Sequence, residues 1–185
     1  MKFIIFFFYF YSIFTTYLYG SIKEKIIDNL YQINNLSFNF IQTIDGKDEK
    51  GNCIIKYPKK IYCVYTQKNR KELVSNGQTL VIKNEKNKQY YLYPIETTPL
   101  NIILDKKLMI DKFKKLEPVK VGKKYYNFEL KDGTNIINIF FDHKDLNMTG
   151  WQTEDIFQNL SITFIYDLKI NNDVNEKIFI LPRMF

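Results

Sequence analysis

Residues 72–84 read ELVSNGQTLVIKN, two runs rich in β-branched and apolar side chains that meet at Asn76-Gly77. Asn and Gly both tolerate the positive φ that a tight type I′ turn requires, and this dipeptide between such runs is the strongest short-range hairpin signal. We therefore expect two antiparallel strands here, at residues 72–75 and 79–84. The stretch also sets a side-chain period of two for the sequence around it.

Similar runs continue on both sides of this hairpin, bounded by turn residues such as Asp45-Gly46, Pro58-Lys59 and Asp132-Gly133. Short β-rich runs that recur with turn signals about every 8–12 residues predict an antiparallel meander. The strands are predicted at residues 36–44, 51–57, 61–65, 72–75, 79–84, 89–93, 125–131, 136–142, 147–153, 160–166 and 177–182.

Helical spacing appears in two places. Before the first strand, apolar residues recur every three or four positions from Ile22 to Ile33, and Asn34-Asn35 follows as a stop signal. The segment 97–116 interrupts the strands, because Pro99 presets a first helical turn and apolar and lysine residues then alternate at helical spacing. We predict one opening helix and two short helices inserted in mid-sheet.

The order is thus a helix, about six strands, two short helices and about five strands. A sheet of that many strands curls, because strand twist accumulates. The sequence therefore predicts an α+β fold: a curved antiparallel incomplete β-barrel of about 11 strands, with a lid of short helices over its concave apolar face.

Residues 1–20 differ from the rest. No charged residue lies between Phe3 and Tyr19, and Gly20-Ser21 supplies small residues where a peptidase would cleave. We interpret residues 1–20 as a signal peptide and 21–185 as a single domain; an uncleaved N-terminal anchor is the alternative. Both interpretations place the domain outside the cytoplasm.

Four short motifs occur in a fixed order: Phe40-Ile41-Gln42, the LVSNGQTL run of 73–80, Thr98-Pro99 and the VNEKIFILP ending of 174–182. Their order and spacing resemble the periplasmic outer-membrane lipoprotein carrier family (LolA-type), whose pattern includes F-x-Q, L-V-S-D-G-K-T-L and a T-P that opens the lid helix. The resemblance covers residues 26–182. Asn76 stands here at the family's Asp position.

The resemblance implies a periplasmic carrier that shields the acyl chains of lipoproteins in an apolar groove and ferries them from the inner to the outer membrane without covalent chemistry. It implies an inner-membrane ABC-type lipoprotein release complex as donor and an outer-membrane acceptor. The alternative is a periplasmic lipid-binding or sensing module on the same scaffold. We expect a monomer.

If position 57 faces the lid, as in the family, strand alternation turns Cys53, Ile55 and Tyr57 inward and brings Ile61, Cys63 and Tyr65 to the same face. We assign the lipid-binding groove to Phe38, Phe40, Ile55, Ile61, Tyr65, Leu80 and Ile82. We assign the lid to Pro99, Leu100, Ile103 and Leu104. In any half-barrel such residues can also be plain core.

Position 57 is also a departure from the family, which often has an Arg immediately before the strand-ending Pro, where it can hydrogen-bond the closed lid. Tyr57 stands at this latch position, and a phenol is a weaker latch than a five-donor guanidinium. We expect lid closure here to depend on apolar packing.

Cys53 and Cys63 are the only cysteines. A hairpin centred near Pro58 would set them nearly opposite each other, within reach of a disulfide bond. Two buried apolar thiols are the alternative.

Composition argues against two other function classes. The net charge is +7, but Arg70 and Arg183 are the only arginines and the lysines alternate with carboxylates, so we expect no nucleic-acid partner. The only histidine, His143, lies in a turn-like stretch without a nearby Ser or Cys, and the glycines form no phosphate loop. We expect no enzyme activity, no cofactor and no metal.

Overall fold

The computed structural model describes residues 20–66, 70–133, 135–154 and 159–183, so the predicted signal peptide lies, up to residue 19, outside the described residues. Over these ranges the chain forms one antiparallel sheet. Its strands are β1 Asn35–Ile44, β2 Lys47–Lys56, β3 Lys60–Tyr65, β4 Lys71–Asn76, β5 Thr79–Asn84, β6 Gln89–Pro94, β7 Val119–Val121, β8 Tyr125–Asp132, β9 Asn135–Asp142, β10 Met148–Glu154 and β11 Leu160–Ile170.

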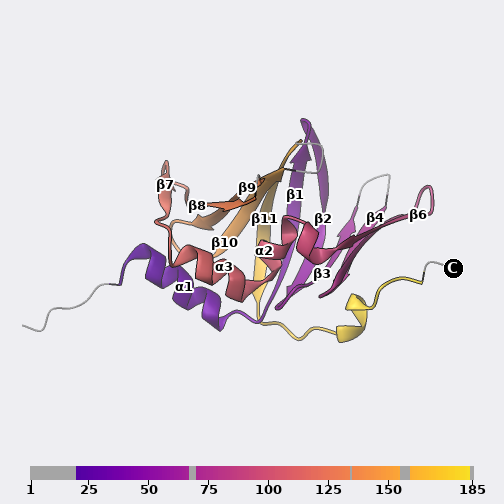
Figure 1. Ribbon diagram of the computed structural model, residues 1–185, viewed down its shortest axis with the longest axis horizontal. Coiled ribbons are helices and arrows are strands. Elements are labelled where there is room, and N and C mark those ends of the chain that lie inside the picture. Colours follow the sequence, from indigo (N-terminus) through magenta and orange to yellow (C-terminus); the bar gives the residue numbers. More distant parts are fainter. Residues whose placement is uncertain (1–19, 67–69, 134, 155–158, 184–185) are drawn as a thin grey trace, which may run out of the picture.

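The strand order across the sheet is β6-β5-β4-β3-β2-β1-β11-β10-β9-β8-β7, so strands β6 and β7 are the two edges and the barrel is not closed. The first and last strands, β1 and β11, pair at the centre. The sheet curls around the helices, as Figure 1 shows. The predicted fold class, an incomplete antiparallel barrel of the α+β class, is confirmed.

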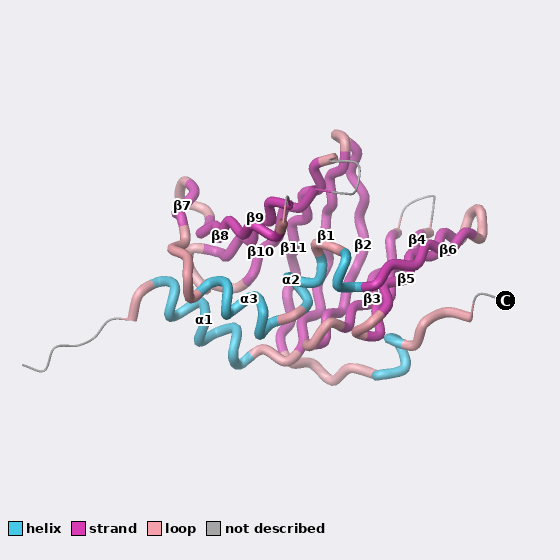
Figure 2. Tube along the Cα trace, in the orientation of Figure 1, coloured by secondary structure: helices cyan, strands magenta, loops and turns pink. Residues whose placement is uncertain are grey.

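The helices are α1 Ile22–Gln32, α2 Leu100–Leu104 and α3 Lys106–Phe113, with 3-10 turns η1 Ile95–Thr97 and η2 Glu176–Phe179. Helix α1 begins at Ser21 in a capping box, in which the Ser21 side chain accepts from the backbone of Glu24 and the Glu24 carboxylate accepts from the backbone of Ser21. Helices α2 and α3 lie across the concave face of the sheet, and α1 packs beside α3 (Figures 1 and 2). None of the helices among the described residues combines the length and the apolar character needed to cross a membrane.

The predicted strand at 177–182 is wrong. The Asn175 side chain accepts a hydrogen bond from the backbone N–H of Lys177 and starts the 3-10 turn η2. This turn contacts β3 and β4, and Phe179 is buried there. The apolar run 178–181 therefore covers the outside of the sheet and adds no strand to it.

The eleventh strand is instead β7, three exposed residues that no alternation pattern could reveal. Strand β2 also begins earlier than predicted, at Lys47, because the tight Asp45-Gly46 turn lets polar residues continue the β1–β2 ladder. Such an extension has no apolar face and leaves no periodic signal.

The concave face is filled unevenly, and we distinguish two halves. In the α3 half, made by β8, β9, β10 and helix α3, the rings of Phe113, Phe128 and Phe141 pack against one another and are almost completely buried. The Phe113 and Phe128 rings stack with 3.9 Å between their centroids. In the α2 half, made by β1 to β6, β11, the last residues of β10 and helix α2, side chains leave space beneath the helix.

Candidate functional site

The α2 half contains a cavity of about 590 Å³ between helix α2 and the sheet. Its volume is within the range of about 300–1,000 Å³ that small-molecule sites occupy. Its lining is mainly apolar and aromatic, with polar side chains on β1, β10 and β11 and at Thr97 and Thr98 before α2. The lining residues are Phe40, Gln42, Ile44, Cys53, Ile61, Cys63, Tyr65, Leu73, Ile82, Tyr93, Thr97, Thr98, Pro99, Leu100, Trp151, Thr153, Glu154, Ser161 and Thr163.

Helix α2 is attached to the sheet at both of its ends. The backbone N–H of Ile95, before the helix, donates to the carbonyl of Gln78 at 2.8 Å. After the last turn, the backbone N–H of Lys59 donates to the carbonyl of Leu104 at 2.7 Å. Gln78 and Lys59 lie in the β4–β5 and β2–β3 turns, so both attachments are at the same end of the sheet.

An ion-pair cluster adds to the second attachment. The Lys59 ammonium lies 3.6 Å from the Glu96 carboxylate and 3.7 Å from the Asp105 carboxylate. Asp105 also caps α3 by accepting from the backbone N–H of Leu108 at 3.1 Å. The pair with Glu96 is largely exposed and contributes about 0.2–1 kcal/mol, so most of the attachment rests on the backbone hydrogen bond and on the buried side chains of α2.

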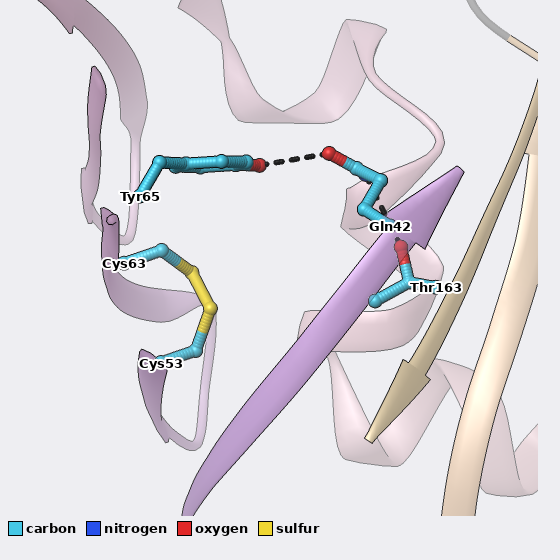
Figure 3. Close-up of a disulfide and its surroundings, with 5 residues drawn as sticks. All are labelled: Gln42, Cys53, Cys63, Tyr65 and Thr163. Carbon is cyan, nitrogen blue, oxygen red and sulfur yellow. Dashed lines mark hydrogen bonds between the residues drawn. A yellow bond between two sulfur atoms is a disulfide. The ribbon is translucent and has the colours of Figure 1, made fainter. Parts of the chain in front are cut away.

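The floor of the cavity carries a disulfide. Cys53 on β2 and Cys63 on β3 are direct partners in the β2–β3 register, and the structure joins them by an S–S bond that lines the cavity (Figure 3). The bond adds a covalent link between two strands that are already paired in a hairpin. It therefore ties together the part of the floor that faces α2.

A row of hydrogen-bonded polar side chains, the Gln42 rung, crosses the cavity floor. The Tyr65 hydroxyl donates to Gln42 Oε1 at 3.0 Å. Gln42 Nε2 donates to Ser161 Oγ at 3.2 Å and to Thr163 Oγ1 at 3.1 Å. Figure 3 shows Tyr65, Gln42 and Thr163 pointing toward one another from strands β3, β1 and β11. The Gln42 rung therefore consists of Tyr65, Gln42, Ser161 and Thr163.

Gly51 makes room for a contact between the rings of Phe40 and Tyr65. It lies between Phe40 and Tyr65 in the register of β1, β2 and β3, and a Cβ on Gly51 would be 2.8 Å from the Phe40 ring. Without that side chain the Phe40 and Tyr65 rings meet edge to face, 4.9 Å apart. Burial raises the pKa of Tyr65 well above its usual range, and the Glu49 carboxylate adds to this shift. The hydroxyl stays protonated and can donate.

The structure divides the residues assigned to the groove. Phe40, Ile61, Tyr65 and Ile82 line the cavity. Phe38, Ile55 and Leu80 are buried in the core cluster and do not line it. Their side chains lie on the concave face as alternation predicts, but other side chains cover them. Contact of any of these residues with lipid stays a prediction.

The lid residues divide in the same way. Pro99 and Leu100 line the cavity, whereas Ile103 and Leu104 are fully buried against the core. Ile102, which the predicted stripe omits, is also fully buried. Helix α2 thus uses most of its apolar surface to dock and leaves one end over the empty space.

Tyr57, at the latch position, makes no polar latch. Its ring packs against the core cluster, and its hydroxyl is buried without a hydrogen-bond partner among the described residues. Burial raises the pKa of Tyr57 far above its ordinary value. The Lys106 ammonium lies 5.7 Å from the centre of the ring. Closure of the lid by apolar packing stays a prediction.

Sequence reasoning missed the polar side of the cavity. Gln42 belongs to the quoted Phe40-Ile41-Gln42 motif, yet the apolar pattern directs attention to Phe40. On β11 the inward positions carry Ser161 and Thr163, and a search for inward apolar residues passes over them. Trp151, which reads as an ordinary half-buried strand residue, meets Phe38 edge-on and lines the cavity.

His143 lies in the β9–β10 turn, where its Nδ1 is 3.1 Å from the carbonyl oxygen of Lys124. It is not among the residues that line the cavity. In the described parts of the chain, no three His, Cys, Asp or Glu side chains lie close enough together to hold a metal ion.

The family model of the outer membrane lipoprotein carrier protein LolA matches residues 31–181. The chain belongs to the LolA family. The match includes every strand of the curved sheet and both helices over its concave face. The family's proteins are binding or carrier proteins, so membership indicates a lipid- or lipoprotein-binding role in the cell envelope. No curated protein sequence matches the chain.

Solved structures share the fold at low sequence identity. An uncharacterized conserved protein from Thermus thermophilus is 8% identical, with a TM-score of 0.53, over 88% of this chain and 93% of that one. MucB is 10% identical with a TM-score of 0.50, over 86% of this chain and 62% of MucB. A LolA superfamily protein from Nitrosomonas europaea is 12% identical with a TM-score of 0.49, over 86% of this chain and 96% of that one. At these identities the first two show the fold alone.

Proposed function

We propose that the protein is a periplasmic carrier that holds the acyl chains of lipoproteins in the cavity beneath α2 and ferries them from the inner to the outer membrane without covalent chemistry. The observation that carries this proposal is the cavity itself, about 590 Å³ of mainly apolar lining under a short helix in a chain of the LolA family. A plain core would fill this space, as the α3 half does.

The energetics suit reversible binding. Each buried methylene contributes about 0.8 kcal/mol, so one sheltered long acyl chain gains roughly 10 kcal/mol. Part of the apolar surface in the cavity is already covered by Leu100 of the lid, so the net gain on binding is smaller. Lid displacement thus lowers the affinity to a level from which cargo can be released.

A cavity of about 590 Å³ is of a size for a single acyl chain, and a triacylated anchor requires α2 to move. The attachments of α2 at Gln78 and Lys59 lie at one end of the sheet, so the helix can swing about that end. We propose an inner-membrane ABC-type release complex as the donor, an outer-membrane acceptor as the recipient, and a monomer as the carrier.

The experiment is extraction of a triacylated lipoprotein from inner-membrane vesicles by the purified domain, measured as soluble complex after the vesicles are sedimented. Leu73→Trp places an indole in the cavity and should abolish extraction, because Leu73 lines it. Leu92→Trp is the matched control, since Leu92 is 46% exposed on the edge strand β6. This control should extract as the unmodified domain does.

Absence of soluble complex with the unmodified domain would overturn the carrier proposal. A domain that binds free lipopeptide in native mass spectrometry but extracts none would instead be the lipid-binding or sensing module, a role that the same fold also allows. Equal extraction by Leu73→Trp and Leu92→Trp would show that the cavity is not the binding site.

A further inference from the structure

We propose that the Gln42 rung is a subsite for the carbonyl group of an ester- or amide-linked acyl chain, so that the cavity prefers neutral acyl esters and amides to free fatty acids. This inference rests on the proposed binding of acyl chains and adds the orientation and the chemical class of the ligand.

Along the cavity, strand β11 places polar side chains inward and apolar side chains outward. Its inward side chains here are Ser161 and Thr163, both buried, whereas Leu160 and Phe164 point outward and are 45% and 43% exposed. A strand that only closed a core would place its apolar side chains inward. Buried polar groups cost free energy unless they are hydrogen-bonded, so this reversal marks a built polar site.

The rung has hydrogen-bond donors to spare. The Gln42 amide supplies two donor hydrogens, and the hydroxyls of Tyr65, Ser161 and Thr163 supply one each. The three hydrogen bonds within the rung use three of these five hydrogens. Two remain without an acceptor among the described residues, whichever way the amide is turned. A ligand with acceptor oxygens, such as a carbonyl group, fits them.

The charge of the ligand distinguishes the two classes of acyl compound that could supply an acceptor oxygen, which are free fatty acids and acyl esters or amides. A free fatty acid brings a carboxylate, and no Lys, Arg or His is among the described residues that line the cavity. The ionisable carboxyl group that does line it, Glu154, repels an anion. Burial of an unpaired carboxylate is costly, whereas an ester or amide carbonyl carries no charge.

The position of the rung orients the ligand. Gln42 pairs with Glu49 near the β1–β2 turn, and Ser161 pairs with Ile44 at the same end of the sheet. The attachments of α2 lie at the opposite end, at the β2–β3 and β4–β5 turns. The acyl tail therefore runs toward these attachments, and its polar linkage stays beside the β1–β2 turn, where the rest of the cargo leaves the cavity.

The test compares two ligands with the same tail, dodecanoate and 1-monododecanoylglycerol, each below its critical micelle concentration at pH 8, by calorimetric titration. We expect the ester to bind at least tenfold more tightly than the ionised acid. Gln42→Leu removes the amide that positions the hydroxyls of Tyr65, Ser161 and Thr163, and should weaken ester binding on the order of tenfold while acid binding changes little. Thr163→Val, of nearly equal volume, should weaken ester binding severalfold.

The matched control is Gln152→Leu. Gln152 lies on β10 between Trp151 and Thr153, which line the cavity, and its own side chain faces away from it. This variant should keep the full preference for the ester. Thermal unfolding of all variants in the absence of ligand verifies that each is folded.

Equal affinity of the unmodified protein for ester and acid, or an unchanged preference in both Gln42→Leu and Thr163→Val, would overturn the subsite and leave acyl binding standing. Failure of both ligands to bind would overturn the proposed function as well. Two further titrations identify the source of the carbonyl. A Gln42-dependent affinity for a synthetic triacylated lipopeptide indicates lipoproteins, and one for a short-chain diacylglycerol indicates glycerolipids.

Discussion

The α3 half and the α2 half of the concave face are built on one continuous sheet, yet the first is packed solid and the second is hollow. Helix α3 brings Phe113 against two phenylalanines of β8 and β9, and the three rings fill the space. Helix α2 has five residues, LNIIL, with no ring to fill the curve beneath it. The comparison shows that the volume of the helix side chains decides which half leaves space for a ligand.

The largest expected effect lies in the filled half. Phe113→Ala should lower the free energy of unfolding by about 3–5 kcal/mol, because it leaves a cavity among side chains that cannot collapse. Urea denaturation of the ligand-free domain measures it. A loss below about 1 kcal/mol would show that the α3 half is not packed as the ring contacts indicate.

The disulfide comes next. Replacement of both Cys53 and Cys63 by Ala should lower the free energy of unfolding by about 2–3 kcal/mol, because the bond closes a short loop in the unfolded chain. The same denaturation experiment on the double variant measures the loss. If reductant destabilises the unmodified domain as much as the double substitution does, the bond accounts for the whole effect; no response to reductant would contradict the disulfide.

The sequence revealed the sheet better than it revealed the cavity. Ten of the eleven strands follow from alternation and turn residues, and both lid helices follow from Pro99 and the helical spacing after it. The 177–182 run was misassigned because an apolar run can cover a sheet as well as extend it. Its Asn175 cap was the signal against a strand.

The cavity was harder to predict, because alternation tells which side chains point inward and not which of them meet another side chain. Phe38 and Phe40 share one face of β1, yet Phe40 lines the cavity and Phe38 packs against Trp151. The Gln42 rung depends on three strands that are far apart in sequence. It becomes visible only when β11 pairs with β1.

The third expected effect concerns alkaline pH. Burial raises the pKa of Tyr57 and Tyr65 in the folded state, while the unfolded chain loses these protons near pH 10. Below about pH 10 both hydroxyls are protonated in the folded and in the unfolded chain, so their titration does not change the free energy of unfolding. Above about pH 10 that free energy falls by about 1.4 kcal/mol per pH unit for each tyrosine, because only the unfolded chain releases the proton.

Tyr57→Phe separates the two tyrosines. The variant removes a buried hydroxyl that has no partner among the described residues, so it should be more stable than the unmodified domain by about 1 kcal/mol at pH 8. Its stability should also fall less steeply between pH 10 and 11.5 in urea denaturation. A destabilised variant at pH 8 would mean that the hydroxyl is a working latch.

The smallest effect on stability is expected in the hollow half. Leu100→Ala should cost below about 1 kcal/mol, because Leu100 is only partly buried and faces existing empty space. The same change should speed the exchange of a bound fluorescent acyl chain, since it shortens the lid residue over the cavity. A stability loss equal to that of Phe113→Ala would erase the difference between the halves.

The most direct test of the central claim is a crystal structure of the domain with a lipopeptide whose acyl chains carry bromine near their ends, located by anomalous scattering. The account predicts bromine peaks beneath α2, beside Ile61 and Leu73, with the phenylalanine cluster of the α3 half unchanged. Bromine found only outside that cavity, or inside a reopened α3 half, would contradict it.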